Sequence, residues 1–198
     1  MIRRLACGLV AATFLMGPPA LAAGPNTFEF AAMGDVPYKI PNDYPAVDRL
    51  IAAINASKPA FTLHVGDTKA GSSPCTDEVL KKAFDQMQTI EGALHYTIGD
   101  NEWVDCHRKD AGGFDPRERL KKVREIYFPQ PGKSLGKTPM TVESQGLVSP
   151  EFATYVENTR FEKNGICCPR QGQRGLDQLL FRPRQGKRGQ GHGALHPG

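Results

Sequence analysis

Three aspartates, each preceded by glycine, are the residues of this sequence whose type and spacing could support chemistry. Asp35, Asp67 and Asp100 each close a short apolar run, and they follow one another at intervals of 32 and 33 residues. Carboxylates that gather at one place repel one another, and a divalent cation that prefers oxygen ligands would relieve the repulsion. The three Gly-Asp pairs therefore indicate a cation site built on a repeated unit, although each pair could also be an ordinary strand-end turn.

Short strands are expected to lead into the three Gly-Asp pairs. The segments 28–35, 60–67 and 93–100 are apolar and rich in residues that favour β-structure. Their spacing is that of strand–helix–strand units, so the sequence predicts an α/β fold with a parallel sheet and right-handed crossovers. Neighbouring strands are about 4.8 Å apart and parallel strands end at one edge, so the three aspartates should fall within roughly 10 Å of one another.

Helices are expected between and after these strands. Apolar residues recur at helical spacing after Asp43 and again after Thr76, and both residues can cap the start of a helix. A third helix is expected after Asp115, with Pro116 at the first helical position, where proline is favoured.

The residues around the aspartates form a set of motifs that resembles a known family. Gly-Asp-Val-Pro-Tyr occupies residues 34–38, Gly-Asp residues 66–67, and Gly-Asp-Asn-Glu-Trp residues 99–103. In order and context they resemble the calcineurin-like metallophosphoesterases over residues 28–165, and most of all an exported bacterial branch with Gly-Asp-x-Pro-Tyr and Gly-Asp-Asn-Glu-Trp. The resemblance implies a metallophosphoesterase-like sheet sandwich flanked by helices, two-metal hydrolysis and a small phosphorylated substrate.

The resemblance also implies a role for each motif residue. Asp35 would be a ligand of the first metal, Asp67 would bridge two metals, and Asp100 stands at the position of a second-metal ligand. Asn101 occupies the position of the histidine that protonates the leaving oxygen, and Glu102 matches the acid that orients that histidine. The aspartates would hold two divalent metal ions, drawn from Mn, Fe, Zn or Mg, and Asn101 and Glu102 would stand at the catalytic positions.

Two departures from the family pattern concern its histidines. Pro37 stands where the first motif has a metal-binding histidine, so the first metal site has lost a ligand or takes it from elsewhere. Asn101 cannot act as a general acid, because its amide does not titrate. His107 is a candidate substitute, and the alternative is that it is an ordinary histidine of a surface loop.

The amino terminus predicts export. Residues 1–22 combine two arginines, an apolar stretch and an Ala-Leu-Ala cleavage site, which is typical of a signal peptide. A periplasmic or secreted protein is therefore expected. No apolar run reaches the roughly 18 residues that a membrane span needs, so no integral membrane contact is expected.

Two cysteines lie next to the expected site loops. Cys75 follows the Asp67 loop and Cys106 follows the Asp100 loop, so both should lie near the same edge of the sheet. A disulfide between them fits an oxidising compartment and would stabilise the fold by on the order of 3 kcal/mol. The alternative is a pair of free thiols.

The family pattern stops near residue 165. Asn164-Gly165 predicts a type I′ hairpin, but residues 166–198 are rich in Gly and Arg and carry six Lys/Arg against one Asp. The late histidine motifs are missing, so residues 23–165 are expected to be a partial phosphoesterase domain with an incomplete C-terminal half. A disordered basic tail is expected from 166 onward, either from a disrupted reading frame or as a genuine tail. No nucleic-acid partner is expected, because the tail has a single Phe and no stacking series.

Three functions follow as hypotheses. The first is an exported metal-dependent phosphoesterase that hydrolyses phosphate esters. The second is a non-catalytic exported module whose aspartate edge holds one structural cation. The third is an inactive truncated gene product.

Overall fold

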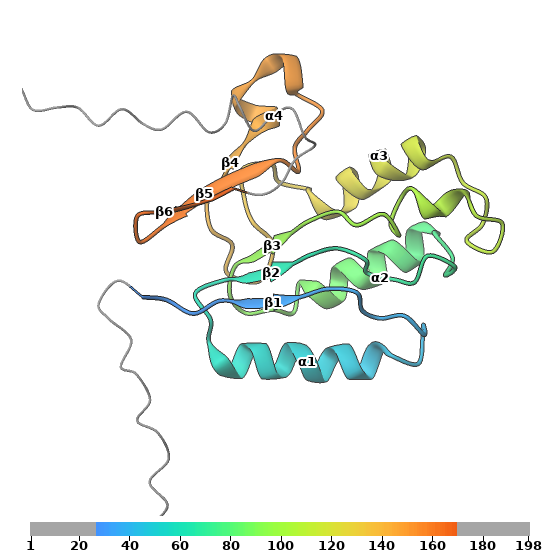
Figure 1. Cartoon of the computed structure of the whole chain (residues 1–198), viewed down its shortest axis with the longest axis horizontal. Coiled ribbons are helices and arrows are strands. Elements are labelled where there is room, and N and C mark those ends of the chain that lie inside the picture. Colours follow the sequence, from blue (N-terminus) through green and yellow to red (C-terminus); the bar gives the residue numbers. More distant parts are fainter. Residues whose placement is uncertain (1–26, 170–198) are drawn as a thin grey trace, which may run out of the picture.

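The computed structural model describes residues 27–169, so the expected signal peptide and most of the expected tail lie outside the described residues. In chain order the elements are β1 (Ala31–Met33), α1 (Tyr44–Ser57), β2 (Thr62–His64), α2 (Asp77–Met87), β3 (Leu94–Tyr96), η1 (Asp105–His107), α3 (Pro116–Tyr127), β4 (Glu143–Ser144), α4 (Gln145–Val148), η2 (Pro150–Phe152), β5 (Thr159–Lys163) and β6 (Ile166–Pro169). Figure 1 shows their arrangement around two small sheets. The expected mixed α/β architecture with a parallel sheet is confirmed.

The parallel sheet has the order β1-β2-β3, and its two strand pairs are both parallel. Met33 pairs with His64, and His64 pairs with Tyr96, so the three strands end level with one another. The three Gly-Asp loops begin just beyond these aligned residues and lie along one edge of the sheet. We call this edge the rim: the loop residues 34–38, 66–69 and 99–102.

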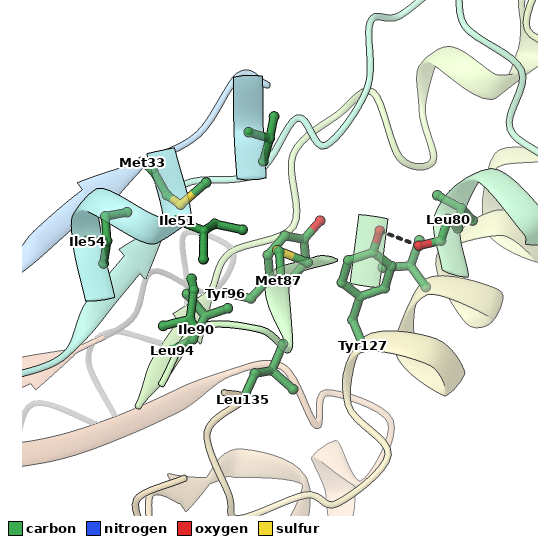
Figure 2. Close-up of a cluster of buried hydrophobic side chains, with 12 residues drawn as sticks. Met33, Ile51, Ile54, Leu80, Met87, Ile90, Leu94, Tyr96, Tyr127 and Leu135 are labelled. Carbon is green, nitrogen blue, oxygen red and sulfur yellow. Dashed lines mark hydrogen bonds between the residues drawn. The ribbon is translucent and has the colours of Figure 1, made fainter. Parts of the chain in front are cut away.

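One face of the parallel sheet is covered by α1, α2 and α3. Alternate strand residues point toward these helices and form a continuous apolar cluster with them (Figure 2). Within it the Tyr127 hydroxyl donates to the Leu80 carbonyl oxygen at 2.9 Å, which ties α3 to α2. The cluster consists of Met33, Val47, Ile51, Ile54, Leu80, Met87, Ile90, Leu94, Tyr96, Val123, Tyr127 and Leu135.

The helix starts follow the capping residues of the sequence, with one exception. The Thr76 hydroxyl accepts a hydrogen bond from a first-turn N–H of α2, and the Asp115 carboxylate accepts two from α3. Asp43 takes the N-cap position of α1, but its carboxylate instead accepts the backbone N–H groups of Tyr38 and Lys39, at 3.2 and 2.8 Å. Judged by length and hydropathy, no helix in the range 27–169 could span a bilayer.

The opposite face of the parallel sheet packs against an antiparallel sheet of order β4-β5-β6 (Figure 1). Phe161 of β5 is the main contact between the two layers. Its ring stacks on His95 with centroids 3.9 Å apart and meets Phe61 edge-on at 5.1 Å. His95 therefore has a packing role between the sheets.

The β5–β6 hairpin corrects the expected boundary of the folded region. Asn164 and Gly165 have φ values of 50° and 78°, as the expected type I′ turn requires, and Lys163 pairs with Ile166 across it. Pairing continues to Pro169, so the chain is ordered for four residues of the segment that its composition assigned to a disordered tail. Backbone hydrogen bonds set by the turn extend a strand without an alternating apolar pattern. The remainder of that tail lies outside the described residues.

Candidate functional site

The rim loops are tied to one another by backbone contacts. The N–H of Asp35 donates to the carbonyl oxygen of Gly66 at 3.1 Å, which joins the β1 loop to the β2 loop. The N–H of Asn101 donates to Asp67 Oδ1 at 3.2 Å, which joins the β3 loop to the β2 loop. Asp67 therefore stands in the middle loop, held from both sides.

The glycines of the Gly-Asp pairs are explained by the close approach of these loops. A Cβ at Gly66 would lie 2.4 Å from the backbone nitrogen of Gly99, and a Cβ at Gly99 would lie 2.1 Å from Asp67 Oδ1. Asp35 and Asp67 both adopt the left-handed backbone region, with φ of 58° and 57°. Aspartate tolerates that region better than most non-glycine residues, and its use at functional sites is common.

Asp67 carries the strongest electrostatic perturbation on the rim. The pKa of its carboxyl rises from 3.8 to about 6, first because the group is partly buried. The negative charges of Glu102, Asp100 and Asp35 raise this pKa further, and the hydrogen bond from the N–H of Asn101 opposes them. Asp35 and Asp100 thus both lie within electrostatic range of Asp67, in keeping with the parallel topology. Asp35 and Asp100 are exposed, and Asp67 is half-buried between them.

Tyr38 is a rim residue that the sequence reasoning missed. Its hydroxyl donates to Asp35 Oδ1 at 2.8 Å. That hydrogen bond, partial burial and the charges of Asp35, Asp67 and Asp100 raise the pKa of Tyr38 to about 12. The signal was available in the Gly-Asp-x-Pro-Tyr motif, in which the tyrosine follows the aspartate by three residues.

Glu102 is the last residue of the rim, and its side chain is fully buried. Its Oε1 accepts hydrogen bonds from the backbone N–H and the hydroxyl of Thr68, the latter at 2.7 Å, and its Oε2 accepts from the N–H of Asp67 at 3.3 Å. The Thr68 hydroxyl also lies 3.2 Å from that of Tyr127. Glu102 therefore fixes the conformation of the loop that carries Asp67.

Asn101 is also buried, and its side-chain amide is engaged inside the protein. Its Nδ2 donates to the carbonyl oxygen of Lys69 at 3.0 Å. The Asn101 carbonyl oxygen lies 3.7 Å from both sulfur atoms of the disulfide Cys75–Cys106. Asn101, which the resemblance places at the position of a proton donor, thus connects the Asp67 loop, the Asp100 loop and the disulfide.

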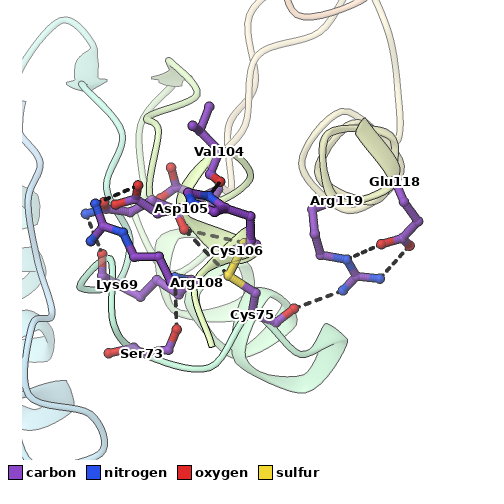
Figure 3. The surroundings of a disulfide bond; sticks show 12 residues. Lys69, Ser73, Cys75, Val104, Asp105, Cys106, Arg108, Glu118 and Arg119 are labelled. Atoms are coloured by element: carbon purple, nitrogen blue, oxygen red, sulfur yellow. Dashed lines mark hydrogen bonds and ion pairs between the residues drawn. A yellow bond between two sulfur atoms is a disulfide. The ribbon is translucent and has the colours of Figure 1, made fainter. Parts of the chain in front are cut away.

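The expected disulfide is present in the structure. Cys75 and Cys106 are bonded at 2.01 Å and fully buried, and they pack against Ala111 and Phe114 (Figure 3). Arg119 of α3 donates to the Cys75 carbonyl oxygen at 2.9 Å, so the disulfide is also tied to the third helix (Figure 3). This covalent link joins the two loops that follow the second and third aspartates.

Lys69 is a buried cation that the sequence reasoning did not single out. Its Nζ donates to the carbonyl oxygens of Ala70 and Ser73, both at 3.1 Å, and its side chain is fully buried (Figure 3). Burial lowers the pKa of the ammonium group, and the nearby carboxylates of Glu102 and Asp105 oppose that effect. Lys69 therefore places a positive charge below the carboxylates of the rim.

Among the hydrogen bonds of residues 27–169, none joins His107, the candidate substitute for the missing histidine, to the three aspartates. His107 ends η1, is exposed, and has its Nδ1 2.7 Å from the carbonyl oxygen of Val104. Pro37, which the resemblance places at the position of a metal-binding histidine, is buried. Across residues 27–169, no group of three or more His, Cys, Asp or Glu side chains is arranged as a ready metal-ligand set.

Comparison with known proteins finds no match to this chain among protein-family models, curated proteins or solved structures.

Proposed function

We propose that this protein is an exported metal-dependent phosphoesterase that hydrolyses phosphate esters of a small substrate. One observation carries the proposal. The ends of three neighbouring parallel strands bring Asp35, Asp67 and Asp100 to one rim, where burial first, and then the charges of Glu102, Asp100 and Asp35, raise the pKa of Asp67. Such a cluster is unfavourable by itself, and a divalent cation removes the conflict.

The donor set of the rim suits hard divalent cations. Asp35, Asp67 and Asp100 offer carboxylate oxygens, which Mg²⁺ and Mn²⁺ prefer, and Fe or Zn also accept them. In the two-metal proposal these three residues would hold the ions, and the bound ions would lower the pKa of water and polarise the phosphoryl group. Asp67 Oδ1 is engaged with the N–H of Asn101, so its Oδ2 is the oxygen that faces no backbone donor among the observed hydrogen bonds within residues 27–169.

The other residues of the site act by fixing geometry. Glu102 holds the Asp67 loop by three hydrogen bonds, and Asn101 links that loop to the Asp100 loop. The disulfide Cys75–Cys106 fastens both loops from below. These contacts keep the Asp67 carboxylate in position when charge develops on a substrate. Such fixed positioning is the main contribution of a protein to phosphoryl transfer.

The localisation belongs to the same proposal. A buried disulfide is compatible with an oxidising compartment outside the cytosol. Together with the signal-peptide pattern of residues 1–22, it favours a periplasmic or secreted protein.

The test is hydrolysis of p-nitrophenyl phosphate and bis(p-nitrophenyl) phosphate by the purified full chain, with and without Mn²⁺. We expect manganese-dependent turnover that is abolished by Asp67→Asn and retained in Asp85→Asn. Asp85 is a suitable control because it lies on the exposed side of α2 in an ion pair with Lys81 at 2.9 Å. The absence of turnover in the unmodified protein, or turnover that survives Asp67→Asn, would overturn the proposal.

A second candidate is an exported module that binds one structural cation without catalysis. It is favoured because Asn101, at the position expected of a proton donor, cannot supply a proton: its amide does not titrate and already donates to the Lys69 carbonyl oxygen. For this candidate we expect Mn²⁺ to raise the melting temperature of the full chain without turnover of either ester. Turnover above the metal-only rate would exclude it.

A further inference from the structure

The rim offers a phosphate group many acceptors, whereas a phosphate needs donors. Asp35, Asp67 and Asp100 present carboxylate oxygens, and the non-bridging oxygens of a phosphate ester are acceptors as well. Anionic phosphate oxygens are held in proteins by charge-assisted hydrogen bonds from N–H and O–H groups. A phosphate group bound at this rim therefore needs at least one hydrogen-bond donor from the protein.

Three donors around the rim are committed to the interior of the protein. The Lys69 ammonium group donates to two backbone carbonyl oxygens, and the Asn101 amide donates to a third. The Thr68 hydroxyl donates to the buried carboxylate of Glu102 at 2.7 Å. All three side chains are buried, so none of them can reach an exposed phosphate without breaking hydrogen bonds inside the protein, which is costly.

Tyr38 differs from those donors in position and in partner. Its side chain is 44% exposed, and its hydroxyl donates to Asp35 Oδ1 at 2.8 Å, an oxygen that belongs to the rim itself. Its backbone is held in place, because the N–H groups of Tyr38 and Lys39 both donate to Asp43 Oδ2. Tyr38 also lies outside the three hydrophobic clusters of the described residues, so packing does not account for it.

We propose that Tyr38 is a catalytic residue that contacts the substrate, and that its hydroxyl moves its hydrogen bond from Asp35 to a non-bridging phosphate oxygen when the ester binds. No covalent bond changes in this step, and the hydroxyl keeps its proton. The exchange costs little, because one exposed acceptor replaces another. This inference rests on the proposed function and adds the group that recognises the phosphate.

The test compares the full chain with its Tyr38→Phe variant, which removes only the hydroxyl oxygen. Binding of Mn²⁺ and then of inorganic phosphate at saturating Mn²⁺ is measured by titration calorimetry, and hydrolysis of p-nitrophenyl phosphate is measured in parallel. Tyr155→Phe is the matched control, since Tyr155 packs on Phe152 and beneath Arg124.

We expect Tyr38→Phe to weaken phosphate binding and to lower kcat/KM about tenfold or more, the effect of losing one hydrogen bond to a charged group. Its affinity for Mn²⁺ and its melting temperature should stay unchanged, and Tyr155→Phe should match the unmodified protein throughout. A merely structural role for Tyr38 would lower the melting temperature without a selective loss of phosphate affinity, and that outcome would overturn the inference.

The outcomes also separate this inference from the proposed function. If the unmodified protein binds phosphate and turns over ester while Tyr38→Phe behaves identically, the Tyr38 inference is overturned and the phosphoesterase proposal stands. If the unmodified protein binds neither Mn²⁺ nor phosphate, the phosphoesterase proposal is overturned, and the Tyr38 inference with it.

Discussion

Replacing Asp67 by asparagine should stabilise the metal-free protein at neutral pH. The carboxyl of Asp67 has its pKa raised from 3.8 to about 6, so at pH 7 the folded protein holds a carboxylate whose charge it disfavours. Asparagine removes that charge and can keep the contacts of Asp67. Its amide oxygen can accept the N–H of Asn101, and asparagine tolerates the left-handed backbone that Asp67 adopts at φ 57°.

The magnitude follows from the difference between the two pKa values. At 1.36 kcal/mol per pKa unit, the full effect would be about 3 kcal/mol. Asp67 is only half-buried, and solvent screening should reduce the gain to on the order of 1 kcal/mol. A change of that size raises the melting temperature of a domain of this length by roughly 3 °C.

The pH dependence has a definite sign. A carboxyl whose pKa is raised on folding contributes stability that is fully present below its unfolded pKa and is lost as pH rises through its folded pKa. As the pH rises from 4 to about 6, the unmodified protein should therefore lose stability relative to Asp67→Asn. Above that pH the difference in free energy of unfolding between the two proteins should stay constant.

The assay is thermal unfolding in EDTA at several pH values from 4 to 7, with Asp85→Asn as the control. Asp85 forms an exposed ion pair with Lys81, so its replacement should change stability little or lower it slightly. Added Mn²⁺ should raise the melting temperature of the unmodified protein and not that of Asp67→Asn. An Asp67→Asn variant that is no more stable than the unmodified protein at pH 7 in EDTA would refute the idea that burial and neighbouring carboxylates disfavour the charge of Asp67.

Two further changes test the scaffold of the site. Replacing Cys75 and Cys106 together by alanine should lower the free energy of unfolding by on the order of 3 kcal/mol, because the closed loop between them is lost. Urea titrations measure this loss. In the same titrations a reductant should lower the stability of the unmodified protein and leave that of the double variant unchanged. Replacing Asp115 by alanine should lower the melting temperature by removing the cap of α3. Its pKa is lowered by the N–H groups of Glu118 and Arg117, so the cap should stabilise the protein above the ordinary aspartate pKa and be lost as the pH falls below it. A melting temperature of Asp115→Ala equal to that of the unmodified protein at pH 7 would contradict this.

The elements of the parallel layer could be predicted because their signals are local. Thr76 and Asp115 cap the helices that follow them, and each Gly-Asp pair ends an apolar strand. The disulfide followed from the same reasoning, since residues after neighbouring parallel strands meet at one edge. The hairpin turn at Asn164 could also be predicted, but composition assigned residues 166–169 to the tail, whereas they pair with β5, because backbone pairing does not depend on an apolar pattern.

The partners of the site side chains could not be read in the same way. Asp43 stands at a helix start, yet its carboxylate turns back to hold the backbone of Tyr38. Glu102 and Asn101 carry polar groups that a sequence pattern assigns to chemistry, yet both are buried and bind the loops beside them.

Local sequence patterns were enough to predict the strand–helix units, a parallel sheet and an edge at which three aspartates meet, because apolar periodicity and helix capping depend on residues close together in the chain. The partners of the polar groups became known from the tertiary structure, including the hydrogen bond from the Tyr38 hydroxyl to Asp35. The reason is that such contacts join residues far apart in the chain, as Asp67 and Asn101 do, and depend on how closely neighbouring loops approach once the sheet has formed.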